Sequence, residues 1–131
     1  MSESRPIECP FCCLPVERIL DSNADALAVA DAFPVSAGHT LIIARRHVGG
    51  FFELTTAEVV ALYELLCRMK NRIESTLAPG GYNIGVNVGT TAGQTIHHVH
   101  IHLIPRYPGD VVHPIGGVRN IIPGRGNYDR S

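Results

Sequence analysis

The chain has 131 residues, of which 45% are hydrophobic, and its formal net charge is −1. This length suffices for one hydrophobic core, so we predict a single domain over residues 1–131. The near-neutral charge excludes the long-range attraction with which strongly basic domains bind nucleic acid. No window holds the roughly 20 apolar residues that span a bilayer, and the N-terminus does not resemble a secretion signal. We therefore expect a cytoplasmic protein with neither a membrane nor a nucleic acid as partner.

The first part of the chain predicts three strands. Residues 17–20 and 25–30 are expected as short strands on either side of a turn signal at 21–24. Residues 40–44 form an apolar run rich in β-branched side chains, which is typical of a buried strand. We expect this third strand to lie at the centre of a sheet.

One long helix follows, and two more strands come after it. Thr55 and Glu58 form a capping box, and apolar residues recur at three- and four-residue spacing as far as Leu77. Residues 82–88 and 95–104 predict strands joined by a polar turn at 89–93. Frequent proline and glycine predict an irregular tail over about 105–131. Because one helix covers only one face, we predict an α+β fold with a mostly antiparallel five-stranded sheet.

Three histidines alternate along the last predicted strand. Side chains two residues apart share a face of a strand, so His98, His100 and His102 are expected side by side, with the intervening apolar residues under the helix. A single histidine would be interpreted as a half-exposed residue of the sheet without a special role, but three in strict alternation fit that interpretation poorly. The Cα atoms of alternate histidines on a strand are roughly 6.6 Å apart, so two of the rings can bind one metal ion. The third ring lies too far along the strand to join them, so it is available for another role. A neutral imidazole is a competent nucleophile at pH 7, which suits nucleotidyl transfer.

The segment His98-Val99-His100-Ile101-His102-Leu103-Ile104 resembles the signature of the histidine triad superfamily of nucleotide hydrolases and transferases. Gly93-Gln94-Thr95 stands where the phosphate loop of that family stands. The resemblance continues upstream through residues 31–43 and through Asn87, so it covers most of the chain. It implies the histidine triad fold.

The resemblance also implies a role for individual residues. His100 would attack the α-phosphate of an adenine nucleotide, and water would then cleave the nucleotidyl-histidine intermediate. His102 and Gln94 would complete the catalytic set. The implied substrate-binding residues are Asp31 at the ribose and Asn87, Gly93 and Thr95 around the phosphate. Val29, Ala32 and Ile42 would form the walls of a purine slot, although the sequence equally allows them to be core residues. His39 would be a supporting histidine.

The N-terminal cysteines raise the question of a metal. Cys9 and Cys12 have the spacing with which two thiolates reach one tetrahedral zinc ion, but such a site needs two further ligands. The family resemblance implies that His47 and His98 complete it. A closed site of this kind would be structural, and no organic cofactor is expected. The alternative is that Cys9, Cys12 and Cys13 are reduced thiols without a metal.

The sequence leaves the substrate and the acceptor open. The leading hypothesis is a hydrolase of dinucleoside polyphosphates, such as diadenosine tetraphosphate, or of nucleoside phosphoramidates. Alternatives are a transferase that uses phosphate as acceptor, and a protein that binds nucleotides or a partner without catalysis. A third hypothesis places a hydrolytic zinc on two histidines of the strand. The resemblance further implies a homodimer, and in one hypothesis tail residues 111–128 shape the leaving-group pocket.

Overall fold

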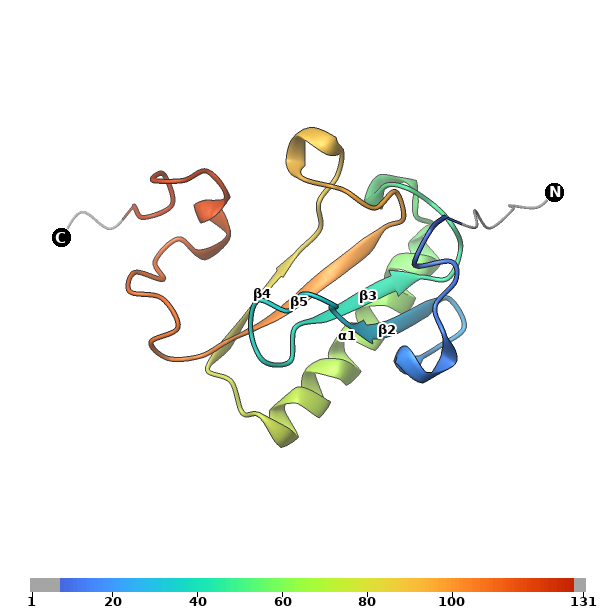
Figure 1. Cartoon of the computed structure of the whole chain (residues 1–131), viewed down its shortest axis with the longest axis horizontal. Helices are drawn as coiled ribbons and strands as arrows, with labels where there is room; N and C mark the ends of the chain where they lie inside the picture. The colour runs from blue at the N-terminus through green and yellow to red at the C-terminus, as the bar shows by residue number, and fades with distance from the viewer. Residues whose placement is uncertain (1–7, 129–131) are drawn as a thin grey trace.

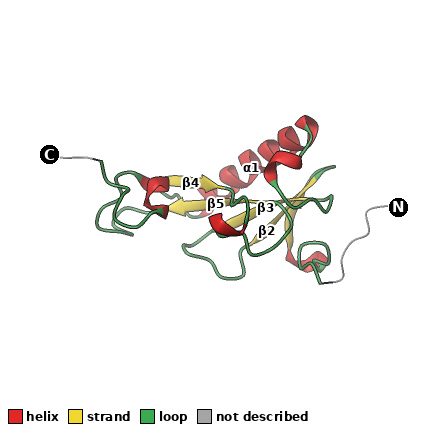
Figure 2. Ribbon diagram, turned by 90° about the horizontal axis from the view of Figure 1, so that it is seen from above, coloured by secondary structure: helices red, strands yellow, loops and turns green. Residues whose placement is uncertain are grey.

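The computed structural model describes residues 8–128, which form an antiparallel sheet with one long helix on one face (Figures 1 and 2). The strands lie in the order β1-β2-β3-β5-β4, and every neighbouring pair is antiparallel. Their bounds are β1 (Ile19–Ser22), β2 (Ala26–Ala30), β3 (Thr40–Ala44), β4 (Gly81–Gly85) and β5 (His100–Arg106), and the helix is α1 (Thr56–Thr76). The described residues also contain the 3₁₀ helices η1 (Val16–Arg18), η2 (Phe51–Glu53), η3 (Thr90–Ala92) and η4 (Gly117–Ile121). The predicted α+β fold with a five-stranded sheet is thereby confirmed.

Strand β3 is the centre of the structure, as its apolar sequence predicted. All five of its residues are buried, because a different layer covers each face of the sheet. Ile42 packs with the helix residues Leu62 and Leu65, whereas Leu41 and Ile43 pack with the N-terminal cysteine turn. A purine-slot role for Ile42 was therefore wrong, since strand alternation turns this side chain toward α1.

Helix α1 begins as its capping box predicted. The Thr55 hydroxyl accepts from Glu58 N (3.1 Å), and the Glu58 carboxylate accepts from Thr55 N (2.9 Å). The same carboxylate receives two hydrogen bonds of 2.9 Å from the Arg46 guanidinium, which ties the helix to the segment after β3. Within the described part of the chain, no helix combines the length and apolar character that crossing a membrane requires.

The Glu58 carboxylate gives one testable pH dependence. Hydrogen bonds from Arg46 lower its pKa from 4.5 to about 2. A depressed carboxyl pKa stabilises the fold above about pH 4.5, and this contribution is lost as the pH falls toward 2. Urea titration at pH 5 and at pH 2.5 measures this loss in the free energy of unfolding. We expect the loss to be larger in the wild type than in Glu58→Gln by about 1–3 kcal/mol. Glu64→Gln, an exposed change on the same helix, should follow the wild type, and parallel curves for all three proteins would contradict the assignment.

Several predicted boundaries were wrong. Strand β1 begins at Ile19, two residues late, because Val16–Arg18 form η1 after Pro15. Strand β4 ends at Gly85 rather than at residue 88. Strand β5 begins at His100, because the chain before it is held by other contacts, including a hydrogen bond from Val99 N to Val48 O (2.8 Å).

The chain after β5 consists of turns and η4, and it extends past the edge strand β4 (Figure 1). Strand β5 itself continues to Arg106, two residues beyond the predicted end at residue 104. The extent of the domain, residues 1–131, stays a prediction, and its residues 1–7 and 129–131 lie outside the described part.

Candidate active site and metal centre

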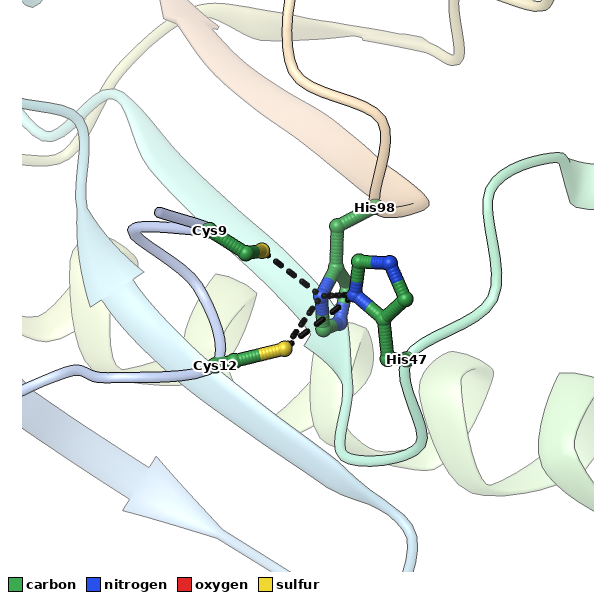
Figure 3. Close-up of side chains that lie close together, drawn as sticks. All are labelled: Cys9, Cys12, His47 and His98. Atoms are coloured by element: carbon green, nitrogen blue, oxygen red, sulfur yellow. Dashed lines mark hydrogen bonds between the residues drawn. The ribbon is translucent and has the colours of Figure 1, made fainter. Parts of the chain in front are cut away.

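Two cysteines and two histidines from three parts of the chain meet below β3 and β5 (Figure 3). Cys9 and Cys12 lie on the N-terminal turn, His47 follows β3, and His98 precedes β5. The Cys12 Sγ to His47 Nδ1 distance is 3.1 Å, the Cys9 Sγ to His98 Nδ1 distance is 3.3 Å, and the two Nδ1 atoms are 3.2 Å apart. Ligand atoms around a tetrahedral zinc ion are roughly 3.3–3.8 Å apart, given the usual bond lengths, and the separations here lie close to this range. The predicted ligand set therefore forms a possible zinc site.

The protonation pattern of His98 fits a metal ligand. Its ring is fully buried, and Nε2 donates a hydrogen bond to the Ala44 carbonyl at 2.7 Å. A neutral imidazole with its proton on Nε2 has a lone pair on Nδ1, which is the atom that faces the cysteine thiols. Such a hydrogen bond to the far nitrogen is the usual support of a metal-bound histidine.

A cavity of about 420 Å³ lies beside this cluster, and it contains most of the predicted site residues. Its lining combines polar side chains with apolar ones, which suits a nucleotide that carries a charged phosphate and a largely apolar base. The predicted residues that line it are Asp31, Asn87, Gly93, Thr95, His100 and His102, and Ala32 of the proposed purine slot. The cavity is also lined by Pro10, Phe11, Arg18, Phe33, Leu41 and Ile96, which the sequence did not single out.

His100 presents one ring nitrogen to the cavity. Its Nδ1 donates a hydrogen bond to the His98 carbonyl at 2.8 Å, so a neutral ring carries its lone pair on Nε2. The Phe11 ring lies edge-on at 5.0 Å between centroids, and the His102 ring lies at 5.1 Å. The unprotonated Nε2 is the nitrogen that a nucleophilic histidine needs.

His102 is held by a chain of hydrogen bonds that ends at the backbone. Val35 N donates to His39 Nδ1 (3.1 Å), which places the proton of a neutral His39 on Nε2. That Nε2 lies 3.0 Å from His102 Nδ1 and 3.3 Å from the Asp31 carboxylate. Donation to His102 Nδ1 leaves the proton of His102 on Nε2, where it can serve as a hydrogen-bond donor in the cavity.

The charge states of this group follow from burial. Desolvation lowers the pKa of His39, which is only 4% exposed. Burial also lowers the pKa of His102, with smaller contributions from His100 and His39. Both rings are therefore neutral at pH 7. Asp31, His39 and His102 lie close enough to share a metal. Because Val35 N donates to His39 Nδ1, however, the proton of a neutral His39 is on Nε2, which is the nitrogen that a metal at this place would need.

Among the predicted catalytic and substrate-binding residues, Gln94 lies apart from the cavity. Its Nε2 donates to the carbonyls of Gly49 (2.8 Å) and Ile96 (3.1 Å), and its Oε1 accepts from Gly89 N (3.0 Å). The side chain thus fixes the loop before β5 and lines a neighbouring cavity. Gly93, with a φ of +96°, lets the same loop turn where a side chain would be strained.

The alternating histidines, the loop before them and the five-stranded sheet define a histidine triad protein. The HIT domain family matches residues 16–109, so the chain belongs to this family. An HIT-like protein of Mycoplasma genitalium is 34% identical over 111 residues, which cover 82% of this chain and 79% of the relative. The crystal structure of a zinc-bound histidine triad family protein from Mycobacterium smegmatis is similar with a TM-score of 0.72, 28% identity, and coverage of 95% of this chain and 86% of the other.

Two relatives with named activities share part of their length with this chain. The asymmetrical bis(5'-nucleosyl)-tetraphosphatase of Schizosaccharomyces pombe is 38% identical over 77 residues, 59% of this chain and 42% of the enzyme. The AP-4-A phosphorylase of Mycobacterium tuberculosis is 33% identical over 99 residues, 73% of this chain and 50% of the enzyme. The chain therefore spans half or less of these enzymes.

Proposed function

We propose that the protein is a nucleotide hydrolase that cleaves adenine nucleotides at the α-phosphate through a covalent nucleotidyl-histidine intermediate. The substrates are dinucleoside polyphosphates, such as diadenosine tetraphosphate, or nucleoside phosphoramidates. The observation that carries the proposal is the cavity in which His100 offers an unprotonated Nε2 and His102 a protonated one. This pair supplies a nucleophile and a hydrogen-bond donor for the phosphoryl oxygens within one site.

The reaction proceeds in two in-line steps. His100 Nε2 attacks the α-phosphorus, and the bond from phosphorus to the leaving-group oxygen or nitrogen breaks on the opposite side. Water then attacks the same phosphorus, which releases the nucleoside monophosphate and restores His100. His102 Nε2, the Thr95 hydroxyl and the loop at Gly93 donate to the phosphoryl oxygens while charge develops on them.

The rest of the cavity binds the nucleoside. Asp31 accepts hydrogen bonds from the ribose hydroxyls with its carboxylate, one oxygen of which already receives Phe33 N (2.8 Å). Phe11, Leu41 and Ala32 provide the apolar surface for the base. Asn87, whose amide lies near Gly93, would contact the phosphate, and Gln94 would act by fixing the loop before β5.

Zinc is the metal we propose for the cysteine and histidine cluster. Cys9, Cys12, His47 and His98 would hold it as a closed tetrahedral set, which leaves no open position for a substrate. The ion would therefore supply structural support to the N-terminal turn and to His98. The hypothesis of a catalytic zinc on His98 and His100 loses support, because His98 Nδ1 faces the thiols rather than His100. A zinc on His100 and His102 stays a hypothesis.

Phosphorolysis is the second candidate, and the similarity to the AP-4-A phosphorylase of Mycobacterium tuberculosis favours it. Phosphate would then replace water in the second step. Diadenosine tetraphosphate would give ADP and ATP with phosphate as acceptor, and AMP and ATP with water. Chromatography of the products in 10 mM phosphate, roughly a cellular concentration, separates the two reactions.

A homodimer is the assembly we propose. Strand β4 forms one edge of the sheet, and its Ile84 is half exposed. Helix α1 also exposes apolar side chains, such as Val60 and Tyr63. An apolar sheet edge is a common site of pairing with another chain. Light scattering coupled to size exclusion measures the mass directly. The cytoplasmic location stays a prediction.

The experiment that tests the proposed function is intact-protein mass spectrometry. The protein is mixed with diadenosine tetraphosphate or adenosine phosphoramidate and quenched without acid after brief reaction. We expect an added mass of one adenylyl group that is absent from His100→Ala. Turnover of neither substrate, with no adduct, would instead favour a protein that binds nucleotides without catalysis.

His39 gives a separate prediction for the same site. Phenylalanine at this position removes the donor to His102 Nδ1, so we expect kcat to fall by about 10- to 100-fold with little change in KM. Glutamine can donate from its amide nitrogen and should retain more activity than phenylalanine. Steady-state kinetics of both variants make the comparison. Equal activity in His39→Gln and His39→Phe would assign His39 a packing role only.

A further inference from the structure

The short turn that carries the two cysteines belongs to two sites at once. Cys9 and Cys12 supply thiols to the metal cluster, and Pro10 and Phe11 between them line the nucleotide cavity. The Phe11 side chain is buried at 8% exposure and packs with Leu41 and Ile43 of β3 in the same core cluster. A metal that fixes the two thiols therefore also fixes one wall of the cavity.

The Phe11 ring connects the cluster to the proposed nucleophile. It contacts the His98 ring edge-on, with the centroids 5.9 Å apart and the planes at 85°. It contacts the His100 ring in the same way at 5.0 Å and 69°. One aromatic side chain thus touches a metal ligand on one side and the proposed nucleophile on the other.

His98 makes a second connection, through its backbone. Its ring lies in the metal cluster, and its carbonyl accepts the hydrogen bond from His100 Nδ1 (2.8 Å) that sets the tautomer of His100. The far nitrogen of the His98 ring is fixed on the Ala44 carbonyl. Any movement of His98 is therefore transmitted to the orientation of His100 as well as to the cluster.

The turn depends on the cluster for its position. It contains one turn-type backbone hydrogen bond, from Cys12 N to Cys9 O (3.2 Å), and no regular strand or helix before η1 within the described residues. Thiols are weak hydrogen-bonding groups, whereas bonds from thiolate to zinc are strong and directional. Metal loading is therefore expected to decide how well Pro10 and Phe11 are held against the cavity.

We infer that metal binding at the cluster and nucleotide binding in the cavity are thermodynamically coupled through Phe11 and the His98 carbonyl. The inference rests on the proposed function, because it assumes that a nucleoside monophosphate occupies the cavity. Coupling between two binding sites is reciprocal, so the metal must raise the affinity for the nucleotide by the same factor by which the nucleotide raises the affinity for the metal. We expect a factor of about ten, within the range usual for coupled sites.

The test measures both affinities on the full chain. Calorimetry gives the affinity for AMP with zinc bound and after chelation, while circular dichroism monitors the fold of the metal-free protein. Competition with a chromophoric chelator gives the affinity for zinc with and without saturating AMP. The expected result is a change of about tenfold in each affinity, in the same direction and of the same size.

Two matched variants locate the coupling. Phe11→Leu keeps both thiols and an apolar side chain but removes the aromatic contacts, so the coupling factor should fall below about threefold, under the range usual for coupled sites. Phe33→Leu changes another phenylalanine of the same cavity, one that is 86% exposed and lies outside the cysteine turn. It should weaken AMP binding while the coupling factor stays at the wild-type value.

The outcomes separate this inference from the proposed function. If AMP binds the zinc-loaded and metal-free proteins equally well, the coupling is absent and the proposed function stands. If AMP binds neither form, both fail. Should chelation unfold the whole protein, the apparent coupling would arise from folding and would be unchanged in Phe11→Leu, and that result also overturns the inference.

Discussion

Replacing His100 with alanine is expected to lower kcat for diadenosine tetraphosphate by a factor on the order of 10⁴ to 10⁶, the usual range for loss of a catalytic nucleophile. Because His100 Nδ1 donates to the His98 carbonyl, the lone pair of a neutral ring lies on Nε2, and loss of this nitrogen removes the proposed covalent step. The affinity for AMP should change by less than about threefold, because the proposed ribose and base contacts involve other lining residues of the cavity.

The measurement has an internal control in the same segment. His97→Ala removes an exposed histidine that lies outside the cavity, and it should retain turnover within about threefold of the wild type. His100→Gly with added imidazole should recover part of the activity, because a free imidazole can take the place of the missing ring. Unchanged turnover in His100→Ala would refute the nucleotidyl-histidine mechanism.

Local patterns predicted those parts of the fold that depend on local interactions. The capping box of Thr55 and Glu58 placed the start of α1 correctly, and the apolar run at 40–44 marked β3 without error. The start of β5 was predicted five residues early. The path of residues 95–99 is set by long-range contacts, from Val99 to Val48 and from His98 to the cysteines, and hydrophobic alternation contains no information about those contacts.

The candidate site likewise has features that could be predicted from the sequence and features that depend on long-range structure. The family resemblance selected about half of the residues that line the cavity, and together with the cysteine spacing it selected the four possible zinc ligands. The resemblance implied a supporting role for His39, but not that its partner is His102. That partner depends on the register of β3 and β5, in which Leu41 lies opposite His102 and His39 lies diagonally beside it. Phe11 was missed for a similar reason, although its position inside the C-x-x-C spacing was the available signal.

Metal removal is expected to have the largest effect on stability. An ion that binds only the folded state stabilises it by about 4 kcal/mol when its free concentration is 1,000 times its dissociation constant. The four ligand atoms come from the N-terminal turn, the segment after β3 and the segment before β5, so the ion would cross-link three parts of the chain. We therefore expect chelation to lower the free energy of unfolding by several kcal/mol, measured by urea titration.

The cross-link also predicts which residues lose stability when the metal is removed. Cys12→Ser should unfold at the same lower urea concentration as the wild type treated with chelator. Its unfolding curve should not change when zinc or chelator is added. Hydrogen exchange should accelerate first at residues 9–12 and 96–99, whereas α1 packs on the other face of β3 and should keep its protection. Cys67→Ser, an exposed cysteine on α1, is the matched control and should retain the full zinc response. If chelation left the wild-type curve unchanged, the cysteines would be reduced thiols of the N-terminal core, and the packing of Phe11 with Leu41 and Ile43 would alone hold the turn in place.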